Sequence, residues 1–469
     1  MTSAAASQAR PRARLRELLS QPVDIAWLAA FRVLFGTVMA ISMLRFLAYG
    51  WIDDFFVTPK FHFKYWLFDW IEPLPAGLMH GLFWLMLALA LCIALGLWFR
   101  LAAAAFALGF AYLSLLDVAI YLNHYYLALL LAVLLCLSPA GQAYALDARQ
   151  GPTVRTVPRL WLVLVRFQVG TVYTFAGLAK ATGDWLVHAQ PLNIWLSART
   201  DLPLLGPLFA QPWAAPLMSW AGFLFDTTIV WWLLWPRARP YAYAAVIGFH
   251  VLTRLLFPIG MFPVIMVLGA LVFFPPDWPR TLWARLRRTF SAQASAPVAA
   301  PRMEGGPTRL VSRFAVYALG LYCALQLLVP LRFLAYGGDV LWHEQGMRFS
   351  WRVMVREKNG SVSFHVRSKA TGRVWEVSPG RWLTRQQERE MAGQPDLILQ
   401  FAHFLRDDFA ARGLGPVEVR AEARVSLNGR PGAVLVDPEV DLARVDDGVA
   451  KAHWIRAAPQ VPPPSVRPI

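Results

Sequence analysis

Charged residues are scarce in this sequence and cysteines are nearly absent. Only 16% of the 469 residues are charged and 57% are hydrophobic, whereas an average soluble domain has about 25% charged residues. The three cysteines, Cys92, Cys136 and Cys323, lie in apolar segments and have no metal-binding or redox spacing. This scarcity argues against an ordinary soluble enzyme, a disordered protein, a disulfide-rich scaffold and a zinc site. The composition predicts an integral membrane protein with an attached soluble part.

Acidic residues are fewer than basic ones, 29 against 45, which gives a formal net charge of +16. In a soluble protein such an excess favours nucleic-acid binding. Here the arginines cluster beside apolar runs, where they are typical of the cytoplasmic loops of membrane proteins. We therefore expect a lipid bilayer, and no nucleic acid, as a partner.

Nine apolar stretches are long enough to cross a bilayer as helices. The first follows Arg10, Arg12, Arg14 and Arg16 without a clear cleavage site, which favours a retained anchor over a signal peptide. The two stretches around Pro258 can be two short spans or one broken span. The nine are residues 24–48, 78–99, 101–122, 125–146, 160–181, 213–235, 241–257, 259–275 and 309–335.

The loop charges predict the orientation of these spans. Arginines follow every even-numbered span, and the opposite connections are acidic or balanced. The positive-inside rule then places the N-terminus in the cytoplasm and the C-terminal region outside it. The arginines are Arg100, Arg149, Arg155, Arg159, Arg237, Arg239, Arg280, Arg285, Arg287 and Arg288, and the acids are Asp53, Asp54, Asp69, Glu72, Asp184 and Asp201.

After residue 340 the long apolar runs give way to segments in which apolar and polar residues alternate. Residues 290–308 have the composition of a cytoplasmic linker within a membrane domain of residues 1–339. Alternation in WRVMVRE, SVSFHVRS, RVWEVSP, VEVRAEARVSL and GAVLVD predicts strands, with tight turns at Asn359-Gly360 and around Asn428-Gly429 and a helix over 384–411. The predicted fold class is a polytopic α-helical membrane protein with about nine spans, a mostly β domain over 340–456 and a Pro-rich tail over 457–469.

Ionisable residues inside spans are costly and often mark function. Lys180, in YTFAGLAKATGDWL, ends the fifth span. It fits either a lysine that reaches to the membrane interface or a lysine kept neutral by burial, able to act as a general base. Tyr173 lies seven residues earlier, on a similar face of the same helix.

Two other polar groups fall in apolar surroundings. Asn123 and His124, in YLNHYYLA, lie at the turn between the third and fourth spans. They fit either structural hydrogen bonding or stabilisation of a developing oxyanion. His250 and Arg254 are four residues apart and share a helix face, with Asp226 of the sixth span as a candidate acidic partner.

The predicted topology places these groups toward one side of the membrane. Lys180 and the Asn123–His124 turn fall at the outer ends of their spans, and His250 falls in the outer half of its span. We therefore expect them to converge on one cavity that opens to the non-cytoplasmic side.

At these residues the sequence resembles the vitamin K-dependent gamma-glutamyl carboxylase family, in the bacterial branch that contains the HTTM (horizontally transferred transmembrane) domain. AGLAKATGDWL resembles the family's catalytic-lysine segment and places Lys180 at the base. FHVLTRLLFPIGMF places His250, and the Asn-His pair of YLNHYYL places Asn123 and His124. Tyr173 falls at a matching tyrosine. RFSWRVM and DPEVDL extend the resemblance into the soluble region.

The resemblance implies an enzyme that uses reduced vitamin K (a naphthohydroquinone such as menaquinol), O2 and CO2. The lysine deprotonates the quinol, the oxygenated intermediate removes a γ-proton from a glutamate of a peptide or protein substrate, and the carbanion captures CO2. The products are γ-carboxyglutamate and quinone epoxide. The resemblance also implies the bacterial inner membrane as the location, with the C-terminal domain in the periplasm.

Three features depart from the animal members of the family. The chain is shorter, their double lysine is Ala179-Lys180 here, and no cysteine outside the spans is available for their disulfide. Two alternatives therefore stand beside the carboxylase. One is a quinone epoxidase without productive carboxylation, and the other, from a different class, is a membrane transporter. Transporters often have inverted repeats, and we find none in this sequence.

The predicted orientation can be tested with a reporter fused after Ile469. A reporter that is active only outside the cytoplasm is expected to be active there, because the charge pattern places residues 340–469 on that side. Activity of a cytoplasm-only reporter at the same position would contradict nine spans with a cytoplasmic N-terminus.

Overall fold

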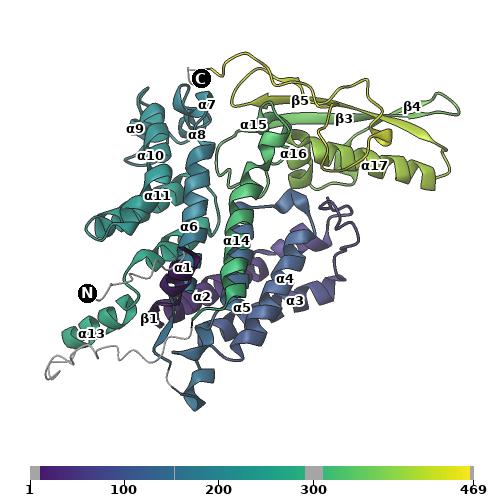
Figure 1. Ribbon diagram of the computed structural model, residues 1–469. Helices are drawn as coiled ribbons and strands as arrows, with labels where there is room; N and C mark the ends of the chain where they lie inside the picture. Colours follow the sequence, from purple (N-terminus) through teal and green to yellow (C-terminus); the bar gives the residue numbers. More distant parts are fainter. Residues whose placement is uncertain (1–10, 153, 291–309, 465–469) are drawn as a thin grey trace, which may run out of the picture.

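The structure, a computed structural model, describes residues 11–152, 154–290 and 310–464. Most of the chain forms a bundle of helices, and a small sheet with two helices covers one end of this bundle (Figure 1). The long helices are α2 (Ala26–Tyr49), α3 (Ala76–Leu95), α4 (Phe99–Leu115), α5 (Asn123–Leu137), α6 (Arg159–Ala179), α10 (Ala214–Leu234), α11 (Arg239–Leu256), α13 (Trp278–Phe290) and α14 (Arg313–Leu331). The shorter elements of the bundle are α1 (Pro11–Ser20), α7 (Gly183–Leu186), α8 (Leu192–Ser197), α9 (Gly206–Phe209), α12 (Phe262–Gly269), and the paired strands β1 (Pro22–Asp24) and β2 (Thr156–Pro158).

Five of the described helices are long and apolar enough to cross a membrane, namely α2, α3, α6, α10 and α14 with its extension to Ala335. A sixth span results if the bent pair Phe262–Phe273 and Trp278–Thr289 counts as one. The protein is therefore an integral membrane protein. The expected nine spans are not confirmed.

The reason is that turns end several of the predicted spans early. α4 has 17 residues and α5 has 15, and α12 has only 8 after the break at Pro258. α4 ends at Leu115 because the chain turns at Asp117, whose side chain accepts a hydrogen bond from the Ala119 amide. An apolar run shows where a helix can enter a bilayer, and the local capping groups decide where the helix stops.

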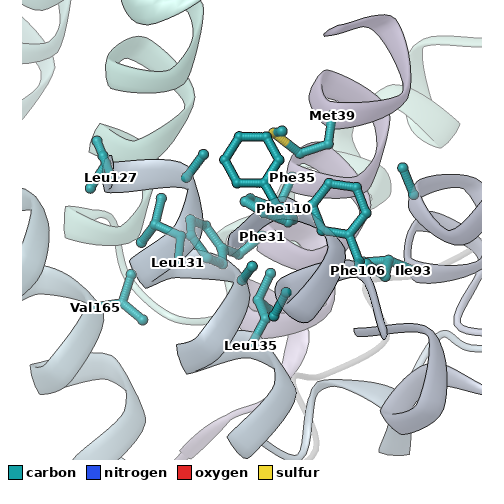
Figure 2. Close-up of a cluster of buried hydrophobic side chains, with 14 of the residues drawn as sticks. Phe31, Phe35, Met39, Ile93, Phe106, Phe110, Leu127, Leu131, Leu135 and Val165 are labelled. Carbon is teal, nitrogen blue, oxygen red and sulfur yellow. The ribbon is translucent and has the colours of Figure 1, made fainter. Parts of the chain in front are cut away.

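The bundle is held by close packing of aromatic and small side chains. Phe31, Phe35 and Met39 of α2 meet Phe106 and Phe110 of α4 and the leucines of α5 (Figure 2). Phe35 and Phe106 pack edge to face with ring centres 6.3 Å apart. At Gly36 a Cβ atom would lie 2.5 Å from the backbone nitrogen of Ala94, so only glycine allows α2 to approach α3 this closely. Such contacts matter in a membrane because lipid removes the hydrophobic driving force between helices.

The C-terminal sheet is antiparallel, with the order β4-β3-β5-β6. Its strands are β3 (Lys358–Ser368), β4 (Val374–Val377), β5 (Val417–Leu427) and β6 (Ala433–Val434). The short helix α15 (Val340–His343) precedes β3, and α16 (Arg385–Gly393) and α17 (Pro395–Ala411) lie between β4 and β5. β3 and β5 pair along eleven residues. α16 and α17 cover the face of the sheet that looks toward the bundle (Figure 1).

The sequence predicted most of β3, β4 and β5, but the domain is not mostly β, because α15, α16 and α17 together hold at least as many residues as its strands. Asn359 and Gly360 do not form a hairpin, because they lie inside β3 and pair with Ser426 and Val425 of β5. Residues 351–357 are not a strand, since Trp351 and Met354 have positive φ angles that break the alternation. The turn at Asn428-Gly429 is confirmed, with φ angles of 54° and 80°.

The helix predicted over 384–411 is two helices, which break at Gln394 before Pro395. The predicted linker 290–308 lies outside the described residues except for Phe290, which ends α13.

The sheet domain is joined to the bundle by a shared core. Phe63 and Val118, from loops of the bundle, are buried among the apolar residues of the domain. Asp117 adds a polar contact, since its Oδ2 accepts a hydrogen bond from Gln387 Nε2 of α16 at 2.8 Å and lies 3.2 Å from His62 Nδ1. The adjoining end of the bundle and the sheet domain are therefore packed as one unit.

Candidate active site

A cavity of about 700 Å³ lies where α2, α4, α5 and the α11–α12 connection meet the sheet domain. Its wall from the bundle is largely aromatic, and its wall from the sheet domain and helix ends is charged. The aromatic residues include Phe46, Trp51, Phe55, Phe56, Phe83, Phe110 and Tyr125. The polar residues include Arg45, Asn123, His124, Arg254, Arg356 and Glu390.

Asn123 and His124 begin α5 and line this cavity. The Asn123 side chain is fixed on both sides, since its Oδ1 accepts from the Tyr121 hydroxyl at 3.0 Å and its Nδ2 donates to the Arg352 carbonyl at 3.3 Å. His124 packs against Tyr125, with ring centres 4.6 Å apart, and forms no hydrogen bond through its ring with any described residue. Its imidazole is thus available to a ligand in the cavity.

Lys180 and Asp226 form a buried ion pair. Lys180 follows the last residue of α6, and its Nζ lies 2.8 Å from Asp226 Oδ2 and 3.2 Å from the Ala176 carbonyl. The two helices approach closely at Gly177, where a Cβ atom would lie 2.8 Å from the Thr227 backbone nitrogen. Lys180 is only 5% exposed, so the alternative of a lysine reaching to the interface is wrong.

The sequence suggested Asp226 as the acidic partner of His250 and Arg254, and this pairing is wrong, because Asp226 pairs with Lys180. The Nε2 atom of His250 lies 3.0 Å from the hydroxyl of Tyr173 instead. The Nδ1 atom of His250 is buried and has no hydrogen-bond partner among the described residues. Arg254, one helical turn later, is exposed on the bundle and lines the cavity.

The structure therefore divides the predicted site into two adjacent groups. Asn123, His124 and Arg254 line the cavity, whereas Lys180, Asp226, Tyr173 and His250 form buried pairs that do not line it. Phe262 lies between the groups, with its ring centre 6.2 Å from that of His124 and 6.0 Å from that of His250.

Comparison with protein families identifies both parts of the chain. The HTTM domain model matches residues 20–278, and the model of the vitamin K-dependent gamma-carboxylase lumenal domain matches residues 311–460. The chain belongs to the vitamin K-dependent gamma-carboxylase family. No solved structure matches it.

In this family member the lumenal-type domain supplies charged residues that the sequence analysis missed. Arg356 and Glu390 line the cavity, and behind them Glu344 lies 3.2 Å from Arg356 and 3.0 Å from Lys358. Burial raises the pKa of Glu390, against the effect of Arg356. Burial lowers the pKa of Lys358 to about 8, against the effect of Glu344.

The signals for these residues were weak. Arg356 stood in a segment that alternates like a strand, and Glu390 stood in an ordinary amphipathic helix. Arg45 was missed as well, although a charged residue near the end of the first apolar span is a signal that could have found it.

The sheet domain also contacts the segment that follows Lys180. Asp184 of α7 accepts hydrogen bonds from Asn428 Nδ2 at 2.7 Å and from both Arg430 Nη atoms at 2.6 and 2.7 Å. The next residue, Trp185, places its ring 5.3 Å from Lys180 Nζ. The turn between β5 and β6 thus holds the short helix whose tryptophan covers the lysine.

Proposed function

We propose that this protein oxygenates a reduced naphthoquinone to its epoxide and uses that reaction to carboxylate glutamyl side chains of a peptide or protein. The observation that carries the proposal is the cavity between the two family domains, which combines an aromatic wall with charged groups from the ends of the bundle helices and from the sheet domain. That combination suits an apolar quinone that meets an anionic glutamyl side chain.

The aromatic wall fits a naphthoquinone. Sites for small molecules have volumes of about 300–1,000 Å³ and mostly apolar linings, and this cavity falls within that range. Phe46 and Phe83 already stack at 5.1 Å, so flat rings are favoured there. Reduced vitamin K supplies, with O2, the base strength needed to remove a γ-proton. The apolar wall excludes water that would quench such a base.

The charged wall fits a glutamyl side chain. Arg356 and Arg254 present guanidinium groups, which bind carboxylates with paired hydrogen bonds. Glu390 lines the same wall, and burial raises the pKa of its carboxyl. CO2 needs no charged site of its own, and it would react with the carbanion inside this water-poor space.

Lys180 is proposed as the base that takes the quinol proton. In this structure its ammonium is paired with Asp226, so it must first lose a proton. Asp226 is positioned to accept that proton through the 2.8 Å contact, which leaves a neutral amine beside a neutral carboxyl. Since Lys180 does not line the cavity, the proposal also requires a local shift that brings the quinone head group to Lys180.

His124, Asn123, Tyr173 and His250 complete the proposed site. His124 and Asn123 are placed to donate hydrogen bonds to an anionic quinone in the cavity. Tyr173 and His250 form a polar pair next to it, and Arg254 lines its edge. We further propose that the sheet domain lies on the periplasmic side of a bacterial inner membrane, with the N-terminus in the cytoplasm.

Replacement of Lys180 tests the base. Lys180→Ala is expected to abolish epoxide formation, because no amine remains to take the proton, while the protein still inserts into membranes. Arginine is expected to fail as well, because its guanidinium does not lose a proton in proteins. The measurement is epoxide formed from reduced vitamin K by purified protein with and without a glutamyl peptide, together with a melting curve.

Recovery of Lys180→Ala by an added small amine would support the role directly. Substantial epoxide formation by Lys180→Ala with a native-like melting curve would remove Lys180 from the mechanism. Equal epoxide formation with and without peptide, and no carboxylated product, would favour the epoxidase alternative.

Replacement of His124 separates chemistry from stability. His124→Ala is expected to lower the epoxidation rate by about 10²–10³, the usual effect of removing one oxyanion donor. Stability should change less, because the His124 ring forms no hydrogen bond with a described residue. Melting temperature and epoxidation rate are measured on the same detergent-purified sample. Lowered stability with normal activity per folded molecule would make His124 a structural residue.

A further inference from the structure

A second cavity, of about 540 Å³, lies at the end of the bundle far from the sheet domain. It is formed by the loop between α5 and β2 together with the first turn of α13. Leu95 and Val154 are among its apolar lining residues, and Arg149 and Arg280 are its two cationic ones. The cavity thus combines apolar walls with two guanidinium groups.

Hydrogen bonds hold residues 140–147 of this connection against α2 and α4. Arg32 of α2 is completely buried and donates hydrogen bonds to the carbonyls of Ala140 at 3.2 Å and Tyr144 at 2.5 Å. Asp147 of the same loop accepts hydrogen bonds from the Trp98 and Phe99 amides at the start of α4. The cavity is therefore present before any ligand binds.

The two arginines of the cavity retain unused donors. Arg280 binds Asp24 only through Nε, at 2.9 and 3.1 Å, and its guanidinium lies 5.2 Å from the Tyr144 ring centre. Its two Nη groups bond to no described residue. Arg149 is exposed, and no described acidic residue pairs with it. Of the nearby acids, Asp24 and Asp147 are engaged by these contacts, and Asp277 is exposed at the start of α13.

α13 extends this basic surface as an exposed amphipathic helix. It is bent by 95° from the apolar segment Phe262–Phe273. Because the two segments are nearly perpendicular, they cannot both run along the membrane normal. Leu282, Trp283 and Leu286 gather on one side of the helix and are 47%, 58% and 42% exposed. The arginines Arg285, Arg287 and Arg288 flank them and are also exposed.

We propose that this end of the protein binds an anionic phospholipid, with its phosphate between Arg149 and Arg280, an acyl chain along the apolar wall, and α13 in the head-group layer. Planar guanidinium groups bind phosphate with paired hydrogen bonds. Tryptophan and leucine beside arginines are the composition of helices that lie in the membrane interface. An anionic lipid satisfies both requirements, whereas free phosphate would leave the apolar wall and α13 uncovered. The proposal is independent of the reaction in the first cavity.

The test is the melting temperature of the full-length, delipidated protein in detergent with added phosphatidylglycerol or phosphatidylcholine. Phosphatidylglycerol is expected to raise the melting temperature more than phosphatidylcholine does. Arg149→Gln should remove at least half of that difference without changing the melting temperature before lipid is added, because Arg149 has no described partner. Arg285→Gln together with Arg288→Gln should reduce the difference in the same direction.

The matched control is Arg424→Gln, an exposed arginine of β5 at the other end of the protein, which should keep the full difference. Equal effects of the two lipids, or an unchanged lipid effect in Arg149→Gln, would overturn the proposal. A full effect from inorganic phosphate alone would also overturn it, since free phosphate would then be the ligand.

Discussion

A charge inside a membrane-spanning segment must find its partner within the protein, because lipid offers none. The Lys180–Asp226 pair is the central case here. It forms because Gly177 lets α6 and α10 come into backbone contact, which brings the lysine after one helix against the aspartate in the middle of the other. The same constraint explains Arg32, which is completely buried and binds two loop carbonyls. The buried ion pair fixes α6 against α10, next to the helices that line the cavity.

The candidate site needs both domains. The bundle supplies the aromatic wall, His124 and the buried pairs, whereas the sheet domain supplies Arg356 and Glu390. The contacts between the domains also end on site residues, since Arg352 holds Asn123 and Arg430 holds the helix next to Lys180. A change in the sheet domain can therefore alter the site without touching a substrate.

The sequence predicted the individual polar positions better than their partners. A lysine or histidine in an apolar run is visible in one segment, so Lys180, His124 and His250 were found. The partner of Lys180 depends on how two helices pack, and Asp226 was assigned to the wrong group for that reason. Alternation predicted β5 and most of β3 correctly, because the two strands pair along their whole length on a half-buried surface. It failed at residues 351–357, where positive φ angles at Trp351 and Met354 turn the chain into the cavity wall. Capping contacts, which composition does not show, determine where α4 ends, so its helix is shorter than the apolar run predicted.

The central claim is that oxygenation of a quinone in the cavity drives carboxylation of a glutamyl side chain. The most direct test is incorporation of labelled carbon dioxide into a glutamyl peptide by the purified protein. The account predicts incorporation that requires reduced vitamin K and oxygen together, proceeds with formation of quinone epoxide, and is lost in Lys180→Ala. Epoxide formation without any fixed label, or fixed label that persists without the quinone, would contradict it.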